Sequence, residues 1–116
     1  MERPTIKDMA IEFTTEITFM CDGIKGRDKF VDQITRSVSS IGANAYEAKY
    51  AQSDADFISK FEIALKECHE TEYWLEVLYR VKAISKEEYD KHMNTCGILR
   101  SKIIASINTV KKRLNK

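Results

Sequence analysis

The chain has 116 residues, a net charge of +1, one proline and four glycines. Its length suits a single domain spanning residues 1–116. The composition, with 43% apolar and 32% charged residues, excludes a disordered chain and favours a helical one. No apolar run approaches the roughly 20 residues of a membrane span, and the N-terminal MERPTIKD does not resemble a secretory signal. We therefore expect a cytoplasmic protein with no membrane partner.

Two helices are predicted in the first half of the chain. The first covers about residues 4–23, begins at the proline and has an apolar seam at three- and four-residue spacing: Ile6, Met9, Phe13, Ile17, Met20 and Ile24. Gly23 and Gly26 bracket a short connection. The second covers about residues 27–50, with a stripe that includes Ile34, Val38, Ile41, Ala45 and Ala48.

Two longer helices follow. Ser53 and Asp56 predict a capped start for a helix over about residues 54–82, and the segment SKEE at 85–88 is a capping box that opens a helix over about 86–114. No segment alternates with the two-residue period of a strand. Long helices joined by short loops predict an all-α fold, an antiparallel up-down-up-down four-helix bundle.

Each cysteine falls on an apolar helix face: Cys21, Cys68 and Cys96. An odd number without a CxxC pair predicts buried free thiols rather than a disulfide framework or a zinc site.

The second helix interrupts its apolar pattern with the run SVSSIGANAYEA at 37–48. At 100° per residue its polar members form a ridge beside the apolar stripe: Ser37, Ser40, Asn44 and Glu47. The third helix offers Glu67, Glu70 and Thr71 at matching spacing. We predict a close-packed, hydrogen-bonded contact between these two sets; a solvated face and a ligand site are the alternatives. Gly42 lies on the other side of the stripe, where another helix could approach closely.

The acids of the third helix raise the question of a metal site or an enzyme. His69 lies close to Glu67 and Glu70 in the sequence, with Glu47 on the second helix, but the Glu-x-x-His spacing of di-iron bundles is missing. No nucleophile elbow, phosphate loop or HExxH motif is present. We expect no metal, no cofactor, no small-molecule substrate and no enzymatic activity.

Two surfaces of the predicted bundle are candidates for binding. A second apolar row on the third helix predicts an oligomer interface at Trp74, Val77 and Val81. The fourth helix ends in bases without acids, and its candidate phosphate contacts for RNA or DNA are Arg100, Lys102, Lys111, Lys112 and Arg113. The alternative is that these bases attract the seven acids of residues 54–79 on a neighbouring helix.

The runs QITRSVSSIGANAYEA at 33–48 and FISKFEIALKECHETEYWLEVL at 57–78 carry a family likeness. They resemble the bacterial four-helix-bundle proteins encoded in intervening sequences of 23S ribosomal RNA genes. Ala48 stands where that family usually has glycine, so we expect the second helix to continue to about Tyr50. The residues that match are Arg36, Ser37, Ser39, Ile41, Asn44, Glu47, Phe57, Ile58, Ile63, Ala64, Glu67 and Leu75.

The resemblance implies a non-enzymatic homo-oligomer, a pentamer in similar bundles, acting as a scaffold or adaptor of unknown precise role. A distant likeness to the accessory variability protein of diversity-generating retroelements, which binds nucleic acid, implies the alternative of a nucleic-acid-binding accessory protein. Fold alone does not decide between them.

Overall fold

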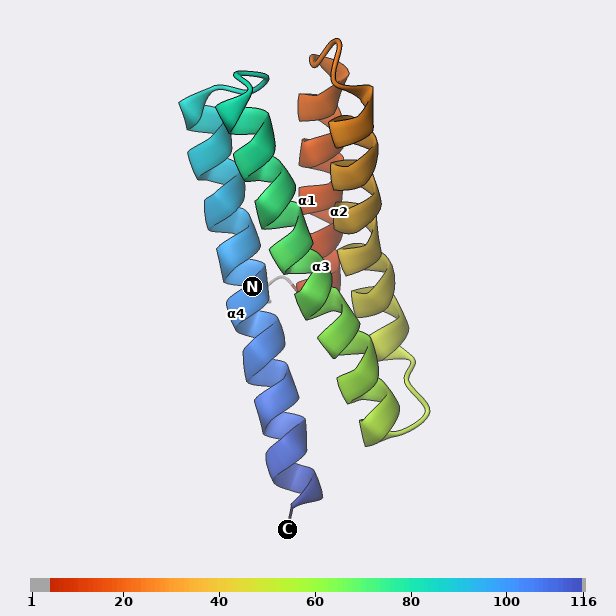
Figure 1. Ribbon diagram of the computed structural model, residues 1–116. Helices are drawn as coiled ribbons and strands as arrows, with labels where there is room; N and C mark the ends of the chain where they lie inside the picture. The colour runs from red at the N-terminus through yellow and green to blue at the C-terminus, as the bar shows by residue number, and fades with distance from the viewer. Residues whose placement is uncertain (1–4, 116) are drawn as a thin grey trace.

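The computed structural model describes residues 5–115, which form four helices and no strand (Figure 1). They are α1 (Ile6–Asp22), α2 (Asp28–Lys49), α3 (Asp54–Arg80) and α4 (Lys86–Leu114). The predicted all-α bundle is confirmed, and α2 runs through Ala48 as expected. The predicted start of the first helix at Pro4 lies outside the described residues.

The helices are arranged as a closed ring of neighbours. Each packs against the next along the chain (Figure 1). The last helix, α4, packs back against α1. The diagonally opposite helices lie farther apart: within the described residues, no Cα atom of α1 lies within 8 Å of one in α3, and none of α2 within 8 Å of one in α4. The short connections force successive helices to run in opposite directions, which gives the up-down-up-down arrangement.

Three helix starts are fixed by side-chain caps. The hydroxyl oxygens of Thr5, Ser53 and Ser85 each accept a hydrogen bond from the backbone N–H three residues later, at 3.0 Å in all three cases. Glu88 completes the predicted capping box by accepting from the Ser85 backbone N–H at 3.2 Å. The caps at Ser53 and Ser85 were predicted from the sequence, whereas the cap at Thr5 was not. Each cap satisfies a backbone donor at the start of its helix that would otherwise be unpaired.

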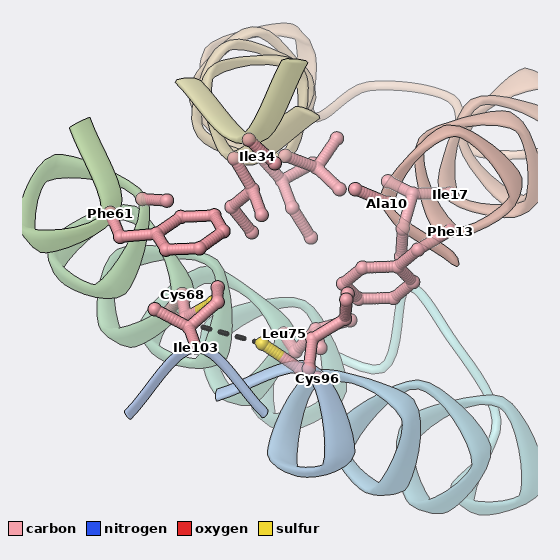
Figure 2. Close-up of a cluster of buried hydrophobic side chains, with 14 of the residues drawn as sticks. Ala10, Phe13, Ile17, Ile34, Phe61, Cys68, Leu75, Cys96 and Ile103 are labelled. Atoms are coloured by element: carbon pink, nitrogen blue, oxygen red, sulfur yellow. Dashed lines mark hydrogen bonds between the residues drawn. The ribbon is translucent and has the colours of Figure 1, made fainter. Parts of the chain in front are cut away.

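One hydrophobic core runs between the four helices (Figure 2). Phe13 and Ile17 of α1, Ile34 of α2, Leu75 of α3 and Ile103 of α4 are fully buried in it. All three cysteines are buried free thiols, as predicted. The Cys96 thiol donates to the Cys68 carbonyl oxygen at 3.4 Å. Its interaction with the Cys68 side chain, together with burial, raises the pKa of Cys96.

The α1–α2 contact is close because Gly42 faces α1. A Cβ atom placed at this glycine would lie 3.6 Å from Thr14 Oγ1 and 3.9 Å from Ala10 Cβ, which are ordinary van der Waals distances. An alanine therefore fits at this position without a clash.

We expect Gly42→Ala to stabilise the fold, because alanine is favoured over glycine in a helix interior by about 0.5–1 kcal/mol. The melting temperature should rise by a few degrees in thermal unfolding followed by circular dichroism. Gly97→Ala in α4 is the matched control, since its Cβ would also meet nothing closer than 3.6 Å. A lower melting temperature for Gly42→Ala alone would show that α1 and α2 lie closer together than described.

The core also holds a histidine. His92 of α4 is buried, its ring centroid lies 6.1 Å from that of Phe13, and its Nδ1 has no hydrogen-bond partner. Burial lowers the pKa of His92 below its ordinary value of 6.5, although the charge of Glu16 opposes the shift. The folded protein therefore favours the neutral ring.

Because the unfolded chain takes up this proton first, we expect the free energy of unfolding to decrease as the pH falls below 6.5. His92→Leu should remove this part of the pH dependence in urea titrations repeated across that range. The control is His69→Gln, because His69 is exposed on α3. An identical pH dependence in wild type and His92→Leu would contradict the assignment.

Candidate functional site

The contact between α2 and α3 contains a buried pair of hydroxyl groups. Ser37 and Thr71 are fully buried, and their oxygens lie 2.8 Å apart. Ser37 is also placed to donate to the Ile34 carbonyl at 3.1 Å, and Thr71 to the Glu67 carbonyl at 2.9 Å. The two hydroxyls have only two protons for these three contacts, so a bond between the helices forms when one hydroxyl donates to the other instead of to the carbonyl of its own helix.

Arg36 covers this hydroxyl pair on the solvent side. Its guanidinium donates to Glu67 Oε2 at 3.3 Å and to Glu70 Oε1 in a short contact. The second oxygen of Glu67, Oε1, is buried without a hydrogen-bond partner. The structure therefore brings Ser37, Glu67, Glu70 and Thr71 together around Arg36.

Three residues of the predicted polar ridge have other partners. Asn44 Nδ2 donates to the Ser40 carbonyl at 2.9 Å and lies 3.2 Å from the Ser40 hydroxyl, so both remain within α2. The Glu47 carboxylate lies 3.5 Å from Lys60 Nζ of α3. The prediction that Asn44 bonds to the Glu67–Thr71 turns is wrong: its amide is close enough to its own helix to be satisfied there.

Arg36 had no predicted role in this contact, although it directly precedes Ser37. The sequence contained a signal for this role. Glu67 and Glu70 are acids, and placing them in a close-packed helix contact requires a positive charge beside them. We predicted only hydrogen bonds between small polar groups across this contact. The positive charge that the two carboxylates require was therefore not assigned to Arg36.

The predicted oligomer row has neighbours within its own chain. The Trp74 ring stacks on Phe30 of α2, with centroids 5.8 Å apart, and its Nε1 is buried without a partner. Val77 and Val81 are half-buried, and Val81 lines a shallow hollow with residues 26–30. Much of this row is thus covered by the start of α2.

The bases of α4 lie against acids of α3. Arg100 pairs with Glu72 at 3.2 Å and Arg113 with Asp54 at 2.9 Å, while Lys111 lies 3.9 Å from Glu62. Lys102 and Lys112 form no ion pair with any residue of 5–115. Three of the five candidate phosphate contacts are therefore already paired with acids.

The acidic residues considered for metal binding are separated by their partners. Glu67 and Glu70 face Arg36, and His69 Nδ1 lies 3.5 Å from Glu72. Among the described residues, no three His, Cys, Asp or Glu side chains are grouped as metal ligands.

No helix in the described part of the chain combines the length and the hydrophobicity that a membrane-spanning segment needs.

The four interfaces between neighbouring helices, which we call seams, differ in their ion pairs. Ion pairs cross α2–α3, α3–α4 and α4–α1, the last being Lys91 with Glu16 at 3.0 Å. Within residues 5–115, no ion pair crosses the α1–α2 seam. The outer side of this seam has a hollow of about 240 Å³, lined by Ile11, Thr14, Thr15, Ser39, Gly42 and Ala43.

Comparison with known proteins agrees with the bundle geometry. Residues 2–105 match the family model described as 23S rRNA-intervening sequence protein. The chain belongs to this family. A crystal structure of a protein of unknown function from the S23 ribosomal protein family of Bacteroides thetaiotaomicron is 42% identical, with a TM-score of 0.83, and the alignment covers 89% of this chain and 98% of that one. A search of curated proteins found no match.

Membership of the 23S rRNA-intervening sequence protein family accounts for the likeness of residues 33–48 and 57–78. Those two runs supply both sides of the α2–α3 contact, including Arg36, Ser37 and Glu67. The motif thus lies where two helices are joined, and its polar groups bond to one another.

For the buried hydroxyl pair, we expect Ser37→Ala and Thr71→Val each to lower the free energy of unfolding by about 1 kcal/mol, the usual contribution of such a hydrogen bond. The double variant should lose less than the sum, because each single change already removes the shared bond. Urea unfolding with an unchanged m-value measures both effects.

Thr109→Val is the control for Thr71→Val. Thr109 also donates to a carbonyl of its own helix, that of Ala105 at 2.9 Å, but it is exposed on α4. Its replacement should change stability by less than about 0.5 kcal/mol. Strict additivity of the Ser37 and Thr71 changes would mean that the two hydroxyls are not coupled.

Proposed function

We propose that this member of the 23S rRNA-intervening sequence protein family is a non-enzymatic homo-oligomer that serves as a scaffold or adaptor. The observation that carries the proposal is the exposure of large apolar side chains on a small bundle. Phe19 and Ile11 of α1 are 69% and 53% exposed, and Tyr46 and Tyr50 at the end of α2 are also exposed. The Tyr46 and Tyr50 rings lie together, with centroids 5.3 Å apart, and exposed apolar groups of this kind mark association surfaces.

The arrangement of the polar groups supports an assembly role over a catalytic one. The acids of α3 that stand nearest to one another, Glu67 and Glu70, are held by Arg36, and Glu72 is held by Arg100. Such pairs connect helices and stabilise a fixed surface. The family resemblance gives five as the number of subunits to expect. The free thiols are typical of a protein in a reducing compartment such as the cytoplasm.

The nucleic-acid alternative has less support from the geometry. Of its predicted phosphate contacts, Arg100, Lys111 and Arg113 already face carboxylates of α3. A phosphate would have to displace these acids, and the net charge of +1 gives little general attraction for a polyanion.

We expect sedimentation equilibrium at tens of micromolar protein to give a mass several times the 13.4 kDa of one chain. The mass should persist at high salt, because an apolar interface is not screened. Ile11→Lys should reduce it, since it places a charge among the exposed apolar groups of α1 and α2.

Ile63→Lys is the matched control for Ile11→Lys. Ile63 is 42% exposed but lies on α3, one helical turn from Lys60 and Glu67, which take part in ion pairs. Its replacement should leave the mass unchanged. A monomeric wild-type protein would refute the proposed function.

A further inference from the structure

A hollow lies at the start of α1, where residues of all four helices meet. Helix α1 has 17 residues, whereas α2, α3 and α4 have 22, 27 and 29. Because of this difference, α4 continues well past the start of α1 (Figure 1). Beyond that start, the described part of the chain has no fourth helix to fill the space, and a hollow of about 300 Å³ remains. We call it the α1 hollow.

The walls of the α1 hollow are mainly apolar. Ile6, Ala45, Phe57 and Phe61 line it. Ala45 and Phe61 belong to the buried core, and the Phe57 ring meets the Phe61 ring edge to face with centroids 4.6 Å apart. A hydrocarbon group that enters the hollow would therefore leave water for a packed apolar surface, which is favourable.

The charged residues that line the α1 hollow are both basic: Lys7 of α1 and Lys49 of α2. Each ammonium lies over a tyrosine ring, Lys7 Nζ at 5.6 Å from the centroid of Tyr46 and Lys49 Nζ at 5.8 Å from that of Tyr50. A ring face attracts a cation but carries no charge that would neutralise it. Both ammonium groups thus keep their charge beside the apolar walls.

One acid stands close to these lysines without lining the hollow. Asp8 Oδ1 lies 3.9 Å from Lys7 Nζ. Hydrogen bonding to Thr5 lowers the pKa of Asp8, and the charges of Lys7 and Lys49 add to this shift, so the carboxylate is ionised at neutral pH. Two ammonium groups and one carboxylate leave a single positive charge beside the hollow.

We propose that the α1 hollow binds a small amphipathic carboxylate, with its hydrocarbon part against Phe57 and Phe61 and its carboxylate beside Lys7 and Lys49. The net positive charge selects an anion over a cation, and the apolar walls select a hydrocarbon chain over a fully polar anion. Such a ligand is bound rather than transformed, and it adds a small molecule that the sequence did not lead us to expect. The inference does not depend on the proposed homo-oligomer.

The volume of the α1 hollow limits the size of the ligand. Since a water molecule occupies about 30 Å³, a hollow of about 300 Å³ has room for about ten non-hydrogen atoms. Octanoate has about ten such atoms, counted in the same way, and is therefore the probe of choice.

Titrations with ligands of equal chain length test the charge and the hydrocarbon contact together. In isothermal titration calorimetry at neutral pH, we expect octanoate to bind with a Kd of about 1 mM or below. Octylamine, which is cationic, and octanol, which is neutral, should bind at least about fivefold more weakly. Acetate should not bind detectably, because it lacks the chain. In nuclear magnetic resonance spectra, octanoate should shift the amide signals of Ala45 and Phe61, which line the hollow.

Removal of the two charges tests the lysines. Lys7→Gln/Lys49→Gln should weaken octanoate binding about fivefold and abolish the preference for octanoate over octanol. Lys25→Gln/Lys66→Gln is the matched control, since both of these lysines are exposed and neither lines the hollow. The control should keep the preference.

Filling the hollow tests its walls. Ser106 lines it from α4 and is half-buried, so Ser106→Leu should occupy the space and abolish octanoate binding. Ser101→Leu on the same helix is the control, because Ser101 is exposed and does not line the hollow. An unchanged circular dichroism spectrum shows that each variant is folded.

Several results would overturn the proposed ligand site. Equal binding of octanoate and octanol would remove the role of the lysines, and shifts at Gly26 and Val81 instead of Ala45 and Phe61 would place octanoate in another hollow. Octanoate binding that appears only after removal of residues 1–4 would favour a hollow occupied by the N-terminus of the chain itself. No binding to either form would refute the site. Each of these results leaves the homo-oligomer to be decided by sedimentation.

Discussion

The rest of the bundle depends on the buried hydroxyl pair between α2 and α3. Ser37 and Thr71 lie in an otherwise apolar core and are 2.8 Å apart, so a slide of one helix by a turn would leave both without their partner. Arg36 reinforces the same register by reaching Glu67 and Glu70. Hydrophobic burial alone tolerates several registers, whereas this polar contact tolerates one.

Once α2 and α3 are fixed, the remaining helices acquire their neighbours. Arg100 and Arg113 fix α4 on α3 through Glu72 and Asp54, and Lys91 reaches Glu16 of α1. The α1–α2 seam closes the ring by close packing at Gly42 and by Thr14 donating to the Val38 carbonyl at 3.2 Å. Among residues 5–115, this seam is thus held by packing and hydrogen bonding without an ion pair.

This distribution explains why the family motif gives little information about a ligand. Its polar residues bond to one another across a helix contact, and the most exposed large apolar side chain, Phe19, lies on α1 outside the motif. Side chains that hold the fold in register and side chains that meet a partner are subject to different constraints.

The sequence by itself determined the elements: the caps at Ser53 and Ser85, the four apolar stripes and the buried thiols, because each depends on residues close together along one helix. Only the tertiary structure decided which partner each polar group takes. Asn44 turned out to bond within α2, and Arg100 to face Glu72, because such choices depend on distances between helices. The hollow on the outer side of the α1–α2 seam likewise exists only when two helices lie side by side, so no single segment could reveal it.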